Sequence, residues 1–192
     1  MSEELCLSRC KRAARRAVAM ATTAAAAFVL GGCGLLAGPT ALQQADPENI
    51  TVTSPEFGQG VAIPRQYTCR GHGVSPPISW SGGPDGTKTL ALVMDDADAP
   101  ISPYVYWIVF NINPATPDIQ AHLPPGAVEA VNSKGIVGYT PPCPSRSHQY
   151  RFTVYALNET VPLRSGANLA SALTAIASHA IGWGRLQDAV NP

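Results

Sequence analysis

Residues 150–157 have the sequence YRFTVYAL. Its side chains alternate, with Tyr150, Phe152, Val154 and Ala156 on one face and Arg151, Thr153 and Tyr155 on the other. Successive side chains of a β-strand point to opposite faces of a sheet, which gives this period of two. The stretch therefore predicts a strand with one face on a hydrophobic core.

Two further segments have the composition of strands. Residues 89–94 (TLALVM) form a short apolar run, and residues 105–112 (VYWIVFNI) are rich in β-branched and aromatic side chains. Turn-forming sequences at 81–86, 113–114 and 141–144 separate the three segments. The chain also holds 18 prolines and 17 glycines, a composition that helical bundles rarely tolerate. Many short strands joined by tight turns are expected.

One helix is expected close to the C-terminus. An apolar stripe at helical spacing comprises Leu169, Leu173, Ile176, Ala177, Ala180 and Ile181. Asn168 precedes the stripe as a candidate N-cap, and Gly182 follows it as a candidate stop. Strands followed by a helix predict a mainly β fold, with a β-sandwich-like core and a small helical addition.

Residues 1–32 have the parts of a secretory signal peptide. Five basic residues between Arg9 and Arg16 precede an uncharged apolar run, which extends from Ala17 to Leu30. This run is shorter than the roughly 20 residues that a transmembrane helix needs. The positive charge in front of the run favours the cytoplasmic side for that end. The pattern predicts export.

Leu30-Gly-Gly-Cys33 resembles the bacterial lipobox, in which the cysteine is acylated and becomes the first residue after cleavage. This resemblance predicts a lipid on Cys33 and a location at the extracytoplasmic face of a cell membrane. Residues 33–49 would then be the lipid-anchored tether, because they are small, polar and proline-marked. The alternative is a plain secreted protein that is cleaved nearby and keeps Cys33 as an ordinary thiol.

Residues 50–192 are long enough for one domain with its own core. The whole chain has 13 basic and 13 acidic residues, but five of the basic and two of the acidic ones precede Cys33. The part from Cys33 onward therefore carries eight basic and eleven acidic residues. A net negative domain without a basic run argues against a nucleic-acid partner.

Cys69 and Cys143 remain as an even pair once the signal segment and Cys33 are set aside. In an oxidising extracytoplasmic compartment such a pair predicts a disulfide bond. The alternative is two buried free thiols, because sequence alone does not bring their Cα atoms within bridging distance.

Two polar segments lie beside turns, residues 94–100 (MDDADAP) and residues 138–150 (GYTPPCPSRSHQY). Their aspartates could be turn residues or Ca²⁺ ligands, but no complete calcium-loop pattern is present and we expect no metal. Cys143, His148 and Asp96 could be imagined as a nucleophile set. The expected disulfide and the lack of a Gly-x-Ser-x-Gly elbow argue against an enzyme.

Several motifs occur in the order found in one known family. They are SPPISWS (residues 75–81), GTKTLALVMDDADAP (86–100), FNI (110–112), GYTPPCP (138–144) and HQY (148–150). From about residue 50 to about residue 185 the chain resembles the phosphatidylethanolamine-binding protein family, most closely its bacterial, Raf-kinase-inhibitor-like branch. The resemblance implies antiparallel sheets with a peripheral C-terminal helix, and a small pocket for an anion such as phosphate or a phospholipid head group.

The resemblance also implies the residues of that pocket. The family's acidic segment matches Asp96, Asp98 and Pro100, and its histidine–tyrosine pair matches His148 and Tyr150. The family's other pocket histidine, which precedes an aromatic residue on the next strand, is replaced here by Tyr106. Tyrosine can donate a hydrogen bond but cannot carry positive charge. Asp96 would repel a bare anion, so we expect it to orient a donor, to bind a protonated phosphate or to meet an ammonium group.

Together these observations predict a binding module without enzymatic activity or a cofactor. Its expected partners are a small anion or phospholipid head group and, through Cys33, the membrane. The alternative, which the family resemblance also implies, is an inhibitor or interaction module for an exported protein such as a protease.

Overall fold

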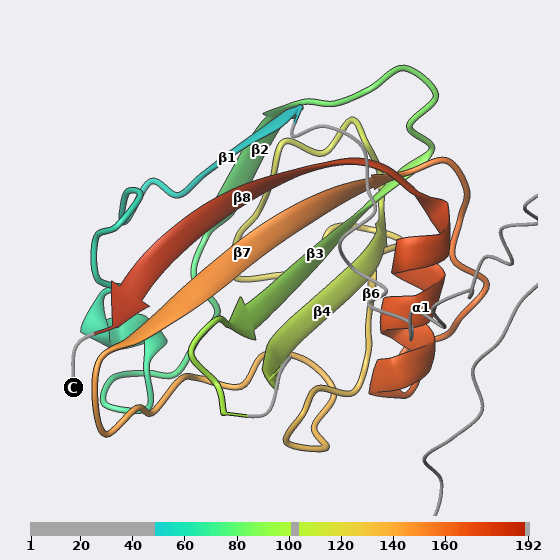
Figure 1. Ribbon diagram of the computed structural model, residues 1–192. Coiled ribbons are helices and arrows are strands. Elements are labelled where there is room, and N and C mark those ends of the chain that lie inside the picture. Colours follow the sequence, from blue (N-terminus) through green and yellow to red (C-terminus); the bar gives the residue numbers. More distant parts are fainter. Residues whose placement is uncertain (1–48, 101–103, 191–192) are drawn as a thin grey trace, which may run out of the picture. The chain divides into compact units, whose positions relative to one another are not determined.

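A computed structural model describes residues 49–100 and 104–190 of the chain (Figure 1). The predicted signal peptide, Cys33 and all of the tether except Asn49 lie outside the described residues. In the part of the chain that the structure describes, no helix has the length and apolar character to span a bilayer.

The main element of the fold is a five-stranded antiparallel sheet with the order β6-β4-β3-β7-β8. Its strands are β6 (Val128–Glu129), β4 (Tyr104–Ile112), β3 (Thr89–Asp96), β7 (His148–Leu157) and β8 (Ala180–Val190). The three strands predicted from the sequence are the three central ones, and each is longer than predicted by one to two residues. Figure 1 shows β4, β3, β7 and β8 side by side.

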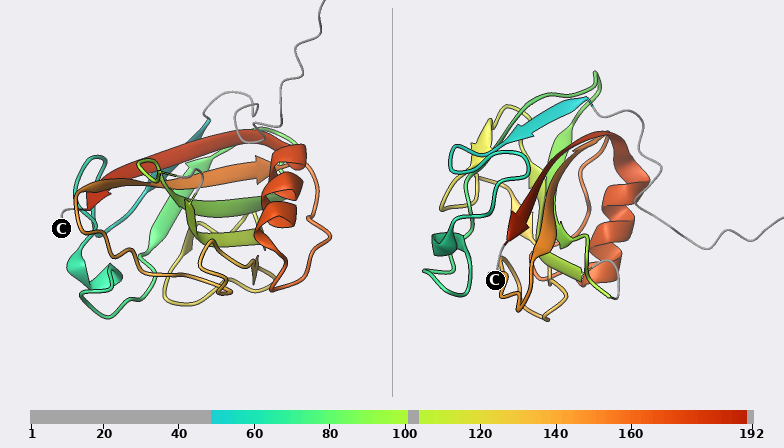
Figure 2. Two further views of the ribbon diagram at one scale, coloured as in Figure 1. Left: turned by 60° about the horizontal axis from the view of Figure 1, so that its bottom comes forward. Right: turned by 60° about the vertical axis from the view of Figure 1, so that its left-hand side comes forward.

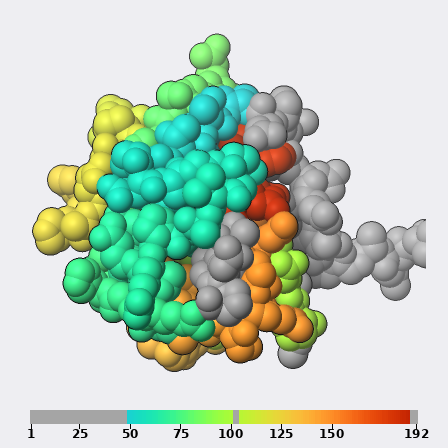
Figure 3. Space-filling model, turned by 90° about the vertical axis from the view of Figure 1, so that its left-hand side faces the viewer, coloured from blue at the N-terminus to red at the C-terminus, as the bar shows by residue number. Residues whose placement is uncertain are grey.

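A smaller antiparallel sheet has the order β1-β2-β5. It consists of β1 (Ile50–Thr53), β2 (Ile78–Gly82) and β5 (Asp118–Ile119). The segment between β1 and β2 contains the short 3-10 helix η1 (Arg65–Tyr67). Figure 3 shows this segment, in turquoise to green, spread over one face of the molecule.

The large sheet is buried on both faces. One face packs against the small sheet and brings together Met94, Trp107, Phe152 and Val154 with Ile78 and Trp80 of β2. The other face packs against helix α1 (Leu169–His179), whose Ala172 and Ile176 are fully buried. Figure 2 shows the helix and the small sheet on opposite sides of the large sheet. Burying one large apolar side chain contributes roughly 1.5–3 kcal/mol, so these two layers hold the fold together. This confirms the predicted mainly β, sandwich-like fold with a peripheral helix.

The structure corrects the predicted end of the helix. Asn168 caps its N-terminus as predicted, and its Oδ1 accepts the Ser171 N–H at 2.9 Å. The helix ends at His179, however, so Ala180, Ile181 and Gly182 belong to β8 and Gly182 is no helix stop.

The glycines of β8 are explained by the close approach of β1. A Cβ atom on Gly184 would overlap the carbonyl oxygen of Ile50, and one on Gly182 would overlap the Asn49 side chain. Glycine therefore stands here because another backbone lies directly against the strand. Because glycine is also typical of a helix end, the sequence pattern did not predict this eleven-residue strand.

Candidate functional site

The predicted site residues meet where β3 ends and β7 begins, at the lower left of Figure 1. Asp96 lies opposite Tyr150 in the β3–β7 pairing, and Tyr150 lies opposite Asp188 in the β7–β8 pairing. Directly opposed residues of an antiparallel pair share a face of the sheet. Asp96, Tyr150 and Asp188 therefore form a row across three strands, on the face that packs against the small sheet.

The centre of the site is a hydrogen-bonded pair of Asp96 and His148. Nδ1 of His148 lies 2.8 Å from Oδ2 of Asp96. The Asp96 side chain is 4% exposed and the His148 side chain 15% exposed. A carboxylate can only accept, so Nδ1 carries the proton and Nε2 of the neutral ring offers a lone pair. Arg146 donates to that lone pair through Nε at 3.4 Å.

The second oxygen of Asp96 is also used within the protein. Oδ1 accepts the backbone N–H of Asp98 at 2.8 Å, which closes a turn directly after β3. With both oxygens engaged, Asp96 serves to orient His148. Of the roles expected for this acid, orienting a donor is the one that the geometry supports.

Asp98 and Pro100 lie at the margin of the site. The Asp98 carboxylate accepts the backbone N–H of Gln149 at 2.8 Å, and the Gln149 carbonyl accepts the N–H of Ala97. These bonds tie the loop after β3 to the start of β7. Pro100 is exposed at the end of this loop, next to residues 101–103, which the structure does not describe.

Tyr106 reaches the site because of a β-bulge. Met94 pairs with Trp107 and Asp95 pairs with Val105, so Tyr106 is an extra residue in β4. An extra residue bends a strand locally and redirects its side chain. The Tyr106 ring meets the Tyr150 ring edge-on, with 5.3 Å between centroids. Tyr150 is fully buried and its ring is stacked near that of His148 at 6.3 Å.

Both tyrosines keep their protons at neutral pH. Burial is the largest cause that raises the pKa of Tyr106 above its ordinary value. Burial raises the pKa of Tyr150 further, and the neighbouring Tyr106 adds to that rise. Two neutral tyrosines therefore lie near His148, and one of them, Tyr106, stands at the position that the resemblance assigns to a second histidine.

The wall of the site is the segment 138–144, which Asn132 holds in place. Nδ2 of Asn132 donates to the Gly138 carbonyl at 2.9 Å and to Thr140 Oγ1 at 2.7 Å. The N–H of Thr140 donates to the Tyr106 carbonyl at 2.9 Å, which joins the wall to the bulge of β4. The sequence analysis missed Asn132, because an isolated asparagine near a glycine has the signature of an ordinary turn.

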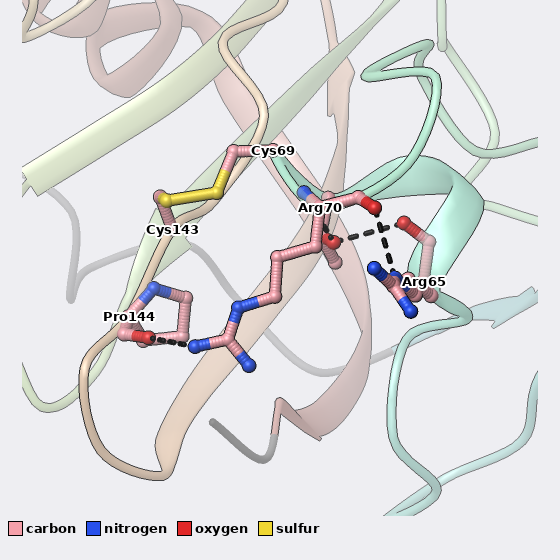
Figure 4. The surroundings of a disulfide bond; sticks show 6 residues. Arg65, Cys69, Arg70, Cys143 and Pro144 are labelled. Atoms are coloured by element: carbon pink, nitrogen blue, oxygen red, sulfur yellow. Dashed lines mark hydrogen bonds between the residues drawn. A yellow bond between two sulfur atoms is a disulfide. The ribbon is translucent and has the colours of Figure 1, made fainter.

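A disulfide bond fastens the same wall to the segment around η1 (Figure 4). Cys69 and Cys143 are bonded as predicted, with their Cα atoms 5.3 Å apart. The N–H of Cys69 donates to the Pro142 carbonyl at 3.1 Å, and Nη2 of Arg70 reaches the Pro144 carbonyl at 3.4 Å. The thiol that a nucleophile at Cys143 would need is thus occupied.

Asp188 is a second acid on the same face of the sheet, and no motif in the sequence pointed to it. It is 1% exposed, and neither carboxylate oxygen has a hydrogen-bond partner among the described residues. Burial raises the pKa of Asp188 to about 7. The face that carries Tyr150 therefore holds a second carboxyl group, and that group is largely protonated below about pH 7.

Two hollows of the described residues lie away from this site. An open groove of about 410 Å³ runs along α1 and is lined by residues such as Leu163, Thr174 and His179. Another, of about 370 Å³, lies along β1 beside Arg185. Within residues 49–100 and 104–190 there is no cluster of three His, Cys, Asp or Glu side chains that could hold a metal ion.

Comparisons with known proteins show the family of this chain. The model of the family described as phosphatidylethanolamine-binding protein matches residues 53–189. A UPF0098 protein of Methanothermobacter thermautotrophicus is 40% identical over 137 residues, which cover 68% of this chain and 91% of that protein. LppC of Mycobacterium tuberculosis, which is named as a lipoprotein, is 44% identical over 145 residues, covering 72% of this chain and 71% of LppC.

Two crystal structures have the same fold. CT736 of Chlamydia trachomatis, titled a phosphatidylethanolamine-binding protein homologue, aligns with a TM-score of 0.69 and 33% identity over 76% of this chain and 99% of its own. YbcL of E. coli, titled a member of the mammalian family, aligns with a TM-score of 0.70 and 28% identity over 75% of this chain and 99% of its own. Family model, sequence relatives and fold agree: the chain belongs to the phosphatidylethanolamine-binding protein family.

Proposed function

We propose that this domain binds a phosphate group, either as a free anion or as part of a phospholipid head group, at the site around His148. The observation that carries the proposal is the Asp96–His148 pair, in which a buried carboxylate holds Nδ1 at 2.8 Å. Because Asp96 fixes the ring, Nε2 is the atom left to meet a ligand. Once protonated, Nε2 can donate a charge-assisted hydrogen bond to a phosphate oxygen.

The surrounding groups fit such a ligand. Tyr106 and Tyr150 are neutral and hydrogen-bond to each other, which leaves one hydroxyl group that can donate to a further oxygen. The wall at 138–144 is held by Asn132 and by the disulfide, so little conformational entropy is lost on binding. We propose binding without turnover; the sulfur of Cys143, the nucleophile that a catalytic set would need, is bonded to Cys69.

The proposal includes an anchor at the extracytoplasmic face of a cell membrane, through a lipid on Cys33. Support comes from the lipobox-like sequence that ends at Cys33 and from the similarity to LppC, which is named as a lipoprotein. Cys33→Ser tests this part: the variant should move from the membrane fraction to the soluble extracytoplasmic fraction. Retention in the membrane at the wild-type level would reject the anchor.

Isothermal titration calorimetry tests the binding site. Phosphoethanolamine is titrated into wild-type protein, His148→Ala and the control His122→Ala. The control changes an exposed loop histidine between β5 and β6. We expect at least tenfold weaker binding for His148→Ala and unchanged binding for the control. Equal affinity in all three proteins, with the circular dichroism spectrum unchanged, would reject the site.

A further inference from the structure

The interior of the site offers no strong positive charge to an anion. Tyr106 stands where the family has a histidine, and the sheet face beyond it carries the carboxyl groups of Asp96 and Asp188. His148 already donates a hydrogen bond to Asp96. A phosphate with two negative charges would therefore find His148 as the basic side chain beside this row. Positive charge for the ligand has to come from outside this row.

Two guanidinium groups lie at the rim of the site, that of Arg146 on the segment that leads into β7 and that of Arg70 on the segment after η1. Arg146 is exposed and directs Nε toward Nε2 of His148 at 3.4 Å. Arg70 is exposed as well, and its Nη2 reaches the carbonyl of Pro144 beside the disulfide (Figure 4). These two arginines therefore bring positive charge to the start of β7, where the exposed Asp98 carboxylate also lies.

The contact between Arg146 and His148 places a cation at Nε2, the ring atom that Asp96 does not engage. It is long and solvent-exposed, and exposed polar contacts of this kind contribute little to stability. The Arg146 guanidinium can therefore move away from Nε2 at a small cost in free energy. A guanidinium also matches two phosphate oxygens at once, which a lysine ammonium does not.

We propose that Arg146 is the anion-binding cation of this site, with its guanidinium taking two phosphate oxygens while the released Nε2 of His148, once protonated, donates to a third. Arg70 adds a second positive charge at the same rim. The phosphate is thereby held at the mouth of the site, on the outer side of His148. This inference rests on the proposed function and names the residue that replaces the charge lost with the family's second histidine.

The test compares Arg146→Ala and Arg146→Lys with the matched control Arg164→Ala. Arg164 is also exposed, but it lies in the segment just before α1, which packs on the opposite face of the large sheet. Each purified protein is titrated by calorimetry with inorganic phosphate, with phosphoethanolamine and with glycerophosphoethanolamine. We expect at least a tenfold loss of affinity for Arg146→Ala, partial recovery for Arg146→Lys and less than a twofold change for the control.

The outcomes separate this inference from the proposed function. If Arg146→Ala binds as well as Arg164→Ala, Arg146 is not the cation, while the site around His148 stands. If the wild type binds none of the three compounds, both proposals fail. If it binds inorganic phosphate with the predicted dependence on Arg146 but neither head-group compound, the inference is supported and free phosphate is the source of the ligand.

Discussion

His148 donates its Nδ1 proton to the buried Oδ2 of Asp96 across 2.8 Å. The two residues are 52 positions apart in the chain, and the β3–β7 pairing brings them together. The pair fixes which nitrogen of the ring is available to a ligand, so the chemistry of the site depends on the register of two strands.

Asp96→Asn should change the tautomer of His148. An asparagine can still accept the Asp98 N–H, but the ring loses a carboxylate acceptor at Nδ1. We expect the proton to shift to Nε2 in a substantial fraction of molecules, visible in the ¹⁵N chemical shifts of the imidazole at pH 8. Asp98→Asn is the control, because that side chain can keep its bond to the Gln149 N–H. Identical His148 shifts in wild type and Asp96→Asn would contradict the assigned pair.

Asp188 should make the protein less stable as the pH rises from about 4 to about 7. Burial raises its folded-state pKa to about 7, against about 3.9 for an unfolded aspartate. In that window the folded state binds more protons than the unfolded state, so the free energy of unfolding falls with pH and levels off above it.

Asp188→Asn should remove this dependence. Between pH 5 and pH 8, the stability difference between variant and wild type should shift by about 3 kcal/mol in favour of the variant, at about 1.4 kcal/mol per pKa unit. Urea denaturation at both pH values measures it. Parallel pH profiles for the two proteins would show that Asp188 titrates as an ordinary exposed acid.

Loss of the disulfide should destabilise the domain. The bond closes a loop between residues 74 positions apart, and the chain-entropy relation gives about 4 kcal/mol for a loop of that length. Cys69→Ser with Cys143→Ser should therefore lower the urea midpoint, and reduction of the wild type should do the same. Thiol titration verifies that the bond is reduced. An unchanged urea midpoint after reduction would show that the disulfide does not restrict the unfolded chain and so does not stabilise the domain.

Asn132→Ala should weaken both stability and ligand binding. Asn132 is 2% exposed, and its amide serves the carbonyl of Gly138 and the hydroxyl of Thr140 while its oxygen accepts two loop N–H groups. Leaving such buried groups unpaired costs on the order of 2–4 kcal/mol. Asn113→Ala, which removes one exposed turn bond, should cost less than about 1 kcal/mol. Equal losses in the two variants would contradict the bracing role.

The central strands could be predicted because the side chains along each strand either are largely apolar or alternate between an apolar and a more polar face. Strand β8 could not, since Gly182 and Gly184 serve the approach of β1, a partner more than 100 residues earlier in the chain. The same limit applies to the site. Asp96, Tyr106, His148 and Tyr150 follow from family motifs, whereas Arg146, Asn132 and Asp188 gain meaning only from the neighbours that folding gives them.

The most direct test is a crystal structure of the protein soaked with phosphoethanolamine. We expect density for the phosphate within hydrogen-bonding distance of His148 Nε2, with the Arg146 guanidinium turned from the ring to the ligand and the Asp96–His148 bond intact. A site that stays empty at saturating ligand, with Arg146 still on His148, would contradict the binding of a phosphate group and turn attention to protein partners.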